Sequence, residues 1–345
     1  ARSAESTLSV KGKLQQDLMN VNWTLNSPDL QDFYPTLKGR LNGSGSLTGS
    51  LEQPRILANV DGKSLAFDTT KVEAINGDID FTLQANANID SRVTLTGLTL
   101  SELLIDRVDL DVTGKQQSHQ IQLNLASKAI NIDVAADGQL NQSTWTGQFR
   151  QFDFGNDQAG VWHLTQQGKL MLNAKQQDIP RHCWQSEKGN LCIAASHSQD
   201  QWQTSGDFAE LPLSLFEQFS AELEQIKGQL KGQFALAGDN HNVITGNGKI
   251  QLENASVQLN QSELNQKQAI VLKNTFIEYQ LDKTHTTATL NLEPQIDGVS
   301  AINAHVETAS IDVLMADASQ AALTGEVRTN IESLAALQLT HPAIE

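Results

Sequence analysis

The chain lacks any run of 18 consecutive apolar residues, and no apolar segment follows its first residues, Ala1-Arg2-Ser3-Ala4. We therefore expect neither a membrane-spanning helix nor a secretory signal within it. Basic residues are scarce, with 24 Lys and Arg against 40 Asp and Glu and a formal net charge of −16. Because nucleic acids and anionic lipid surfaces are bound through clustered Lys and Arg, we predict neither as a partner. The acidity indicates a solvated surface that is kept soluble by repulsion.

Aromatic residues are also few, at 5% of the chain, which argues against a core of stacked rings. Seven Pro and 23 Gly are too few for a disordered or collagen-like chain. The eight His are scattered without the spacing of metal ligands, and no nucleophile-elbow motif is present. The carboxylates fall on polar strand positions, as Asp109, Asp111 and Asp133 do, and no catalytic pair is marked among them. We predict that the protein is not an enzyme and holds no metal or cofactor.

Cysteine is limited to two residues, Cys183 and Cys192. Between them Lys188-Gly189-Asn190 favours a turn, because Gly and Asn tolerate positive φ. A hairpin there would bring the two sulfurs together, and we predict a disulfide formed in an oxidising compartment, which in a bacterium is the periplasm. The alternative is a metal or nucleophile site, since His182 adjoins Cys183.

The chain is dominated by an alternation of apolar and polar residues, which is clearest at Ile121-Gln122-Leu123-Asn124-Leu125. A period of two is typical of β-strands with one apolar and one polar face. The alternation hardly ever stops, so we expect the apolar positions to form one continuous face. The positions that we predict to line this face are Leu8, Val10, Leu41, Leu47, Ile79, Phe81, Leu83, Val93, Leu95, Val108, Leu110, Val112, Ile121, Leu123, Leu125, Ile130, Ile132, Val134, Ile250, Leu252, Val257, Leu259, Leu290 and Leu292.

A sheet this long cannot leave its apolar face in water. At about 11 residues per strand and turn, the chain would form about 30 strands of about eight residues each. Such a sheet can pair into a dry sandwich, close into barrels or curl around an apolar ligand. The alternation predicts an all-β fold. Because the apolar positions are mostly aliphatic, with few rings to fill a sandwich, the sequence favours curling over a sandwich. We predict a long antiparallel-rich sheet curled into a U-shaped trough with an apolar interior.

Three stretches depart from the alternation, at residues 27–34, 213–223 and 331–337, and predict short amphipathic helices. The first offers Ser27 as an N-cap and Pro28 at the first helical position. Such helices would either cap segments of the trough by packing against them or cover its open mouth as lids. The side chains that would face the ligand from the lid are Leu215, Phe216, Phe219 and Leu223.

Similar sequence follows the first two of these stretches. Residues 37–43, Leu-Lys-Gly-Arg-Leu-Asn-Gly, match residues 226–232, Ile-Lys-Gly-Gln-Leu-Lys-Gly, and the match continues without a gap. This indicates an internal repeat of a short helix, a glycine-punctuated strand and a run of hairpins. The domains that we predict are 1–26, the end of a preceding repeat; 27–210, a trough repeat that contains the disulfide hairpin; 211–330, a second trough repeat; and 331–345, the truncated start of a third.

The segment 41–55, Leu-Asn-Gly-Ser-Gly-Ser-Leu-Thr-Gly-Ser-Leu-Glu-Gln-Pro-Arg, resembles the repeated glycine-punctuated element of the TamB family. It is not a phosphate-binding loop, because no helix pattern and no Lys-Ser/Thr pair follow it. Its glycines instead permit bending or close approach within a strand. The cysteine hairpin and the Leu-Pro-Leu-x-Leu-Phe stretch at 211–216 are similar to the middle-to-late part of that family, and the resemblance covers essentially the whole chain.

The resemblance implies a taco-like β-sheet that crosses the periplasm of a Gram-negative bacterium. TamB proteins belong to the AsmA-like group of bridge-like lipid transfer proteins and are anchored in the inner membrane by an N-terminal helix. The resemblance therefore implies movement of phospholipid between the two membranes and assembly of outer-membrane proteins and autotransporters. It also implies a partner, the Omp85-type outer-membrane barrel TamA, which would bind regions outside this chain.

Two functions are consistent with the residues. In the first, the apolar face conducts phospholipid acyl chains, whose burial contributes about 0.8 kcal/mol per CH₂ without directional preference. In the second, a non-lipid scaffold or chaperone offers its sheet edges to client strands during outer-membrane protein assembly. The variable repeat length argues against a third function, that of a secreted β-solenoid adhesin. The lipid conduit is our preferred hypothesis.

Overall fold

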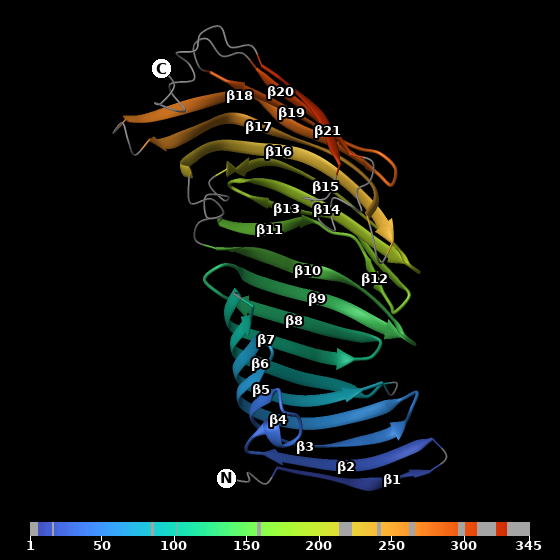
Figure 1. Ribbon diagram of the computed structural model, residues 1–345. Helices are drawn as coiled ribbons and strands as arrows, with labels where there is room; N and C mark the ends of the chain where they lie inside the picture. Colours follow the sequence, from blue (N-terminus) through green and yellow to red (C-terminus); the bar gives the residue numbers. More distant parts are fainter. Residues whose placement is uncertain are drawn as a thin grey trace. The chain divides into compact units, whose positions relative to one another are not determined.

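The computed structural model describes residues 6–15, 17–83, 86–101, 103–156, 160–213, 223–239, 243–261, 266–295, 301–308 and 322–329. These residues are nearly all β, with 21 antiparallel strands and one short 3₁₀ helix (Figure 1). The predicted fold class, a long curled antiparallel sheet, is confirmed. The chain divides into two compact units, which are described separately.

The first unit comprises Ala1–Leu164 and Lys169–Ala174. Its elements are β1 (Thr7–Gln15), β2 (Leu18–Ser27), η1 (Leu30–Asp32), β3 (Leu37–Ser50), β4 (Pro54–Phe67), β5 (Thr70–Thr82), β6 (Asn88–Leu100), β7 (Leu103–Lys115), β8 (Ser118–Ala126), β9 (Asn131–Asn141), β10 (Thr144–Asn156) and β12 (Leu170–Leu172). The chain passes to the second unit within β11 (Gly160–Gln166).

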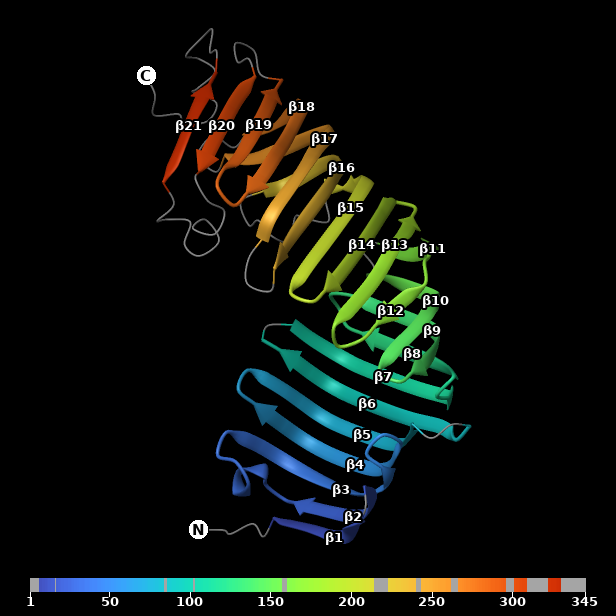
Figure 2. The same cartoon turned by 90° about the vertical axis from the view of Figure 1, so that its right-hand side faces the viewer.

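The second unit comprises Thr165–Gly168 and Lys175–Glu345. Its strands are β13 (Gln176–Ser186), β14 (Gly189–Ser198), β15 (Gln201–Pro212), β16 (Leu223–Asp239), β17 (Val243–Gln261), β18 (Gln266–Asp282), β19 (Thr286–Pro294), β20 (Ile302–Thr308) and β21 (Leu323–Arg328). In both units the strands lie side by side nearly in chain order, with β11 and β12 both paired to β10 (Figure 2).

Nearly every strand pairs with its neighbours in the chain, as expected for hairpins that follow one another, and one exception is β12, which pairs with β10. Val108 of β7, for example, lies opposite Leu95 of β6 on one side and Leu125 of β8 on the other. The strands are longer and fewer than predicted: β3 and β4 have 14 residues each and β17 has 19. The reason is that two sequence features resemble turns but lie inside strands in the structure. One is glycine, and the other is a phase slip, a place where the alternation of apolar and polar residues shifts by one residue.

One such slip occurs along a line across β3–β6, where the backbone adopts positive φ at Gly39 (φ 101°), Ser64 (φ 53°) and Gly97 (φ 59°). A positive-φ residue bends a strand and lets its side-chain alternation restart on the same face. In β4 the apolar face is formed by Gly62 before the bend and by Leu65 after it, and a Cβ built on Gly62 would lie 3.0 Å from Leu65 Cδ1. The apolar face therefore continues across the bend.

The second unit repeats this device in β17 and β18, where Asn254 (φ 50°) and Asn274 (φ 37°) have positive φ. Before the bend the apolar positions of β17 are even-numbered, as at Leu252, and after it they are odd-numbered, as at Val257. The predicted face positions on both sides of this slip thus share one face. Asn tolerates the left-handed conformation better than most residues, which suits it to the bend.

The first helix prediction needs correction. The helix expected at 27–34 is reduced to η1, because Ser27 ends β2 and the N-cap is Asp29, whose side chain accepts a hydrogen bond from the Gln31 amide. Around the helix expected at 213–223, Leu211 and Pro212 end β15, and Leu223 begins β16. Residues 214–222, with the predicted lid side chains Leu215, Phe216 and Phe219, lie outside the described residues, as does the stretch 331–337.

Candidate apolar binding face

The strand register of the first unit brings most of the predicted face residues into adjacent cross-strand rows. One row crosses from β3 to β10 through Leu41, Gly62, Ile75, Leu95, Val108, Leu125, Ile132 and Phe154. The next row contains Gly43, Val60, Gly77, Val93, Leu110, Leu123, Val134 and Phe152. A third contains Gly45, Ala58, Ile79, Ser91, Val112, Ile121, Ala136 and Phe149. None of the three rows contains a charged residue.

The remaining predicted positions of this unit lie at the margins of the same face. Leu47 and Phe81 belong to a fourth row, in which both lie opposite Ile56. Leu83 directly follows β5, and Ile130 directly precedes β9. The edge strand β1 carries Leu8 and Val10, whose side chains are 58% and 60% exposed. We retain all of these as predicted face residues.

The apolar face of the first unit is only half-buried, even at the centre of the rows, where Leu110, Leu123 and Val134 lie. Within the unit, substantial contacts between described elements are those of paired strands, together with the contact of β3 with η1. In a two-sheet sandwich the central side chains would interdigitate with a second layer and be buried. The described residues of the unit form no such layer.

In the second unit the predicted residues also fall into rows. Ile250 and Leu290 belong to a row formed by Leu191, Phe208, Gly232, Ile250, Ile277, Leu290 and Ala304. Leu252 lies opposite Leu230, and Leu292 lies opposite Ile302. Beyond the bend Val257 lies opposite Ile226 and Ile270. The backbone of Leu259 pairs in the same way, but its side chain lies outside the described residues.

Sequence reasoning missed the aromatic part of the face. In β10 the rings of Phe149 and Phe152 meet edge to face with centroids 5.1 Å apart, and Phe154 stacks on Trp162 at 6.1 Å. Phe149 is odd-numbered and Phe152 even-numbered, so strict alternation would assign the two to opposite faces. A bulge between Phe149 and Gln151 brings them to the same face. The signal in the sequence was a slip of one residue in the alternation, as at the other bends.

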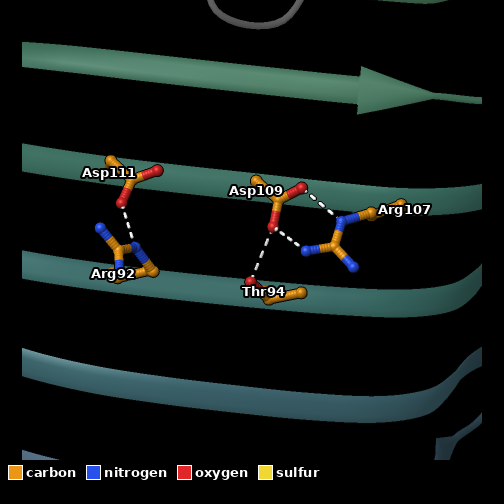
Figure 3. Close-up of polar contacts among 5 residues, drawn as sticks. All are labelled: Arg92, Thr94, Arg107, Asp109 and Asp111. Atoms are coloured by element: carbon orange, nitrogen blue, oxygen red, sulfur yellow. Dashed lines mark hydrogen bonds and ion pairs between the residues drawn. The ribbon is translucent and has the colours of Figure 1, made fainter.

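The polar face of the first unit carries ion pairs between neighbouring strands and along them (Figure 3). Arg92 binds Asp111, and Asp109 accepts hydrogen bonds from Arg107 and, at 2.7 Å, from the Thr94 hydroxyl. These contacts, with that of Arg107 first, hold the pKa of the Asp109 carboxyl below its ordinary value. Because the Arg92 side chain is 67% exposed and water screens the two charges, such a pair contributes little to stability. The polar face keeps the sheet solvated.

One hollow of the second unit is bounded by residues of the polar face. It has a volume of about 340 Å³ and is bounded by Ala194, Ser205, Ala235 and Asn247, which lie in four successive strands. These residues alternate with those of the apolar rows, so the hollow lies away from the predicted face residues. Asp178 of β13 also lines the hollow.

The Cys183–Cys192 disulfide is present, and it joins directly opposite residues of β13 and β14. Both sulfurs are bonded to each other, which excludes the alternative of a free Cys–His nucleophile. The neighbouring His182 side chain is fully buried. Its Nε2 accepts a hydrogen bond from the Gly168 amide at 3.4 Å, and its Nδ1 is hydrogen-bonded to the Pro180 carbonyl. Its role is therefore packing and hydrogen bonding. Within the described ranges no group of three or more His, Cys, Asp or Glu could hold a metal ion.

None of the described residues belongs to a helix that is long and apolar enough to cross a membrane. The two compact units meet in the chain between residues 164 and 175, whereas the predicted repeats begin at 27 and 211. The repeat boundaries thus do not coincide with the compact units. They remain a prediction about sequence repetition.

The comparisons with known proteins agree on one family. A family model described as "TamB, N-terminal domain" matches residues 2–345. The chain is 24% identical over 241 residues to the "Translocation and assembly module subunit TamB" of Haemophilus influenzae, covering 66% of this chain and 18% of that protein. The family model describes an N-terminal domain, whereas the sequence resemblance pointed to a middle-to-late segment. No solved structure matches the chain.

Proposed function

The chain belongs to the TamB family, and from this premise we propose that its apolar face conducts phospholipid between the inner and outer membranes. Lipid acyl chains would lie on the uncharged rows, while the head groups stay in water at the open side of the sheet. The observation that supports this proposal is the half-buried centre of the face, at Leu110, Leu123 and Val134. A face of this size without a covering layer is stable when a mobile apolar ligand occupies it.

The energy of such binding is large enough to retain a lipid and too undirected to hold it in one place. Burial of a sixteen-carbon chain contributes on the order of 12 kcal/mol at about 0.8 kcal/mol per CH₂. Because CH₂ burial has no preferred direction, equivalent positions along the rows bind a chain equally well. A lipid can then exchange between neighbouring rows, and this segment needs no catalytic group.

We propose the cellular setting from the family and the disulfide together. The relative's name assigns that protein to a translocation and assembly module, and the chain spans about 18% of its length. The disulfide between Cys183 and Cys192 suits the oxidising periplasm of a Gram-negative bacterium. We therefore propose a periplasmic segment of a longer, inner-membrane-anchored protein that supports outer-membrane protein assembly. Its partner TamA would bind outside this chain.

The alternative function is a scaffold that offers sheet edges to client strands through main-chain hydrogen bonds. In that function the apolar face need not bind lipid at all, which makes the two functions experimentally separable.

The test places a charge on the apolar face and compares it with the same charge on the polar face. Leu123→Glu adds a carboxylate at the centre of the apolar rows, and Gln122→Glu adds one to the polar face at the next residue. The purified chain is exposed to a diazirine-bearing palmitate, irradiated and mapped by mass spectrometry. We expect labelling of β7–β9 to fall at least fivefold in Leu123→Glu, because an acyl chain cannot hydrate the carboxylate, and less than twofold in Gln122→Glu.

Circular dichroism of both variants controls for folding. If folded Leu123→Glu is labelled as strongly as the wild type, the rows are not the binding face. If the wild type shows neither labelling nor co-purified phospholipid in native mass spectrometry, the conduit function fails. A strand peptide from an outer-membrane barrel that binds the wild type and Leu123→Glu equally well would then support the scaffold.

A further inference from the structure

In the second unit three aromatic rings lie over glycines of neighbouring strands. The ring of Tyr279 in β18 covers Gly248 in β17, so that a Cβ built on Gly248 would lie 2.6 Å from Tyr279 Cζ. Phe234 in β16 likewise covers Gly206 in β15, with Cε1 2.7 Å from such a Cβ. The third pair crosses the same two strands in the opposite sense, from Phe208 in β15 to Gly232 in β16.

These residues form a checkerboard on two adjacent rows of the apolar face. The first row passes through Leu191, Phe208, Gly232, Ile250, Ile277 and Leu290. The second passes through Ile193, Gly206, Phe234, Gly248, Tyr279 and Ala288. Neither row contains a charged residue over the strands β14–β19, and the Ile277 side chain is 46% exposed. The checkerboard is therefore continuous with the face proposed above and suits an uncharged chain.

Each ring fills the space that a side chain on the neighbouring glycine would need. A ring that lies flat adds one van der Waals layer of about 3.5 Å above the backbone, whereas a ring beside a residue with a Cβ has to stand up from it. Gly206 and Gly248 are buried beneath their rings, and burial raises the pKa of the Tyr279 phenol. A glycine in a strand often marks a place where another group approaches closely, and here that group is a ring.

The first unit uses the same device at two places. Trp23 in β2 covers Gly43 and Gly45 in β3. Trp145 in β10 covers Gly138 and Gly147, and its indole N–H donates to His119 Nε2 at 2.7 Å. The sequence alone explains the closely spaced glycines at 43 and 45 only as permitting bending or close approach. In the structure they leave the space that the Trp23 ring occupies.

We propose that the glycine-seated rings of Phe208, Phe234 and Tyr279 set the clearance above the apolar face, so that a lipid acyl chain can lie across β15–β18. The inference rests on the proposed function and names the residues that control it in the second unit. The rings need not contact the lipid for this role. They must stay flat, and the glycines are the specificity-determining residues because they decide how far each ring rises.

Gly248 gives the sharpest test, because the three atoms nearest to a Cβ built on it all belong to the Tyr279 side chain. Gly248→Ala therefore acts on the ring and not on the backbone. The control is Gly246→Ala, two residues along the same strand, where the nearest atoms are the flexible ends of Leu236 and Leu281. The readout is labelling of the β15–β18 peptides by the diazirine-bearing palmitate, divided by labelling of the β7–β9 peptides in the same sample.

We expect this ratio to fall at least fivefold in Gly248→Ala and to stay within twofold of the wild type in Gly246→Ala. Removing the ring from the defective variant, in Gly248→Ala/Tyr279→Ala, should restore the ratio to within twofold of the wild type. If Gly248→Ala does not fold, Tyr279→Ala alone tests the proposal. If the ring sets the clearance, the β15–β18 peptides of Tyr279→Ala should be labelled at least as strongly as in the wild type. A fivefold loss of that labelling would overturn the proposal.

The outcomes separate this inference from the proposed function. A wild-type chain labelled at β7–β9 but not at β15–β18 refutes the clearance role and leaves the conduit in place. Equal ratios for Gly248→Ala and Gly246→Ala do the same. A wild-type chain labelled at neither site refutes the proposed function, and the clearance role with it.

Discussion

Reduction of the Cys183–Cys192 disulfide tests how the second unit is stabilised. The two residues are nine positions apart, so the closed loop holds ten residues when both ends are counted. In the chain-entropy model a cross-link of this length lowers the entropy of the unfolded chain by about 9 cal/mol/K, which is about 2.7 kcal/mol at 25 °C. Both sulfurs are buried, with 8% and 7% of these residues exposed, so reduction leaves the packing nearly unchanged.

The assay is amide hydrogen exchange of the whole chain, followed by mass spectrometry with and without a reducing agent. A loss of about 2.7 kcal/mol corresponds to a roughly hundredfold faster exchange for amides that open with the second unit. We expect this acceleration in β13–β15. The amides of β7 and β8 lie in the first unit and provide the internal control, since their exchange should not change.

A reduced protein whose β13–β15 amides exchange within threefold of the oxidised rate would refute the reasoning. The hairpin would then be held by its strand pairing with β15 and by buried neighbours such as Trp184, and the disulfide would contribute little. Cys183→Ala/Cys192→Ala checks the interpretation, because it removes the cross-link without a reducing agent. It should match the reduced protein apart from the cost of two small cavities.

Two further predictions concern the first unit. Ser64→Val should lower its free energy of unfolding in urea by about 1–3 kcal/mol, because a β-branched residue is strained at φ 53°, whereas Ser44→Val in a regular part of β3 should be nearly neutral. For Asp109, whose pKa is lowered in the folded protein, the stabilising contribution is present above the unfolded pKa of about 3.9 and is lost as the pH falls through the folded value. Asp109→Asn should therefore flatten the acid side of the stability profile measured by thermal unfolding, and an unchanged profile would contradict the assignment.

The sequence predicted the strands and their apolar phase well because alternation is a local property that the fold preserves. Leu123 and Leu125 were assigned to one face from their spacing, and the register with Val134 and Ile132 brings these positions into two adjacent rows. The disulfide was equally predictable from the sequence, since only two cysteines exist and a turn lies between them. Whether lipid occupies the face is a question about a ligand, and it remains the proposal stated above.

The bends were harder to predict. At Ser64 and Asn254 the chain shifts its apolar phase by one residue, and in sequence such a shift resembles the end of a strand. This is why more and shorter strands were expected. The helix expected at 213–223 stays a prediction, because residues 214–222 lie outside the described residues. Only its last residue, Leu223, is described there as part of β16, where it pairs with Leu259 of β17.

The consecutive pairing of strands also bears on how the chain acquires its structure. In each unit nearly every strand finds its partner in the strand directly before it, and β12 skips only β11 to pair with β10, so no pairing has to wait for a distant part of the chain. Loop closure is then short at every step, which favours fast folding for a β protein. A chain delivered from its N-terminus can fold vectorially, hairpin by hairpin, while the rest is still in transit. Each added hairpin lengthens the sheet by about 10 Å, so length is encoded simply as the number of hairpins.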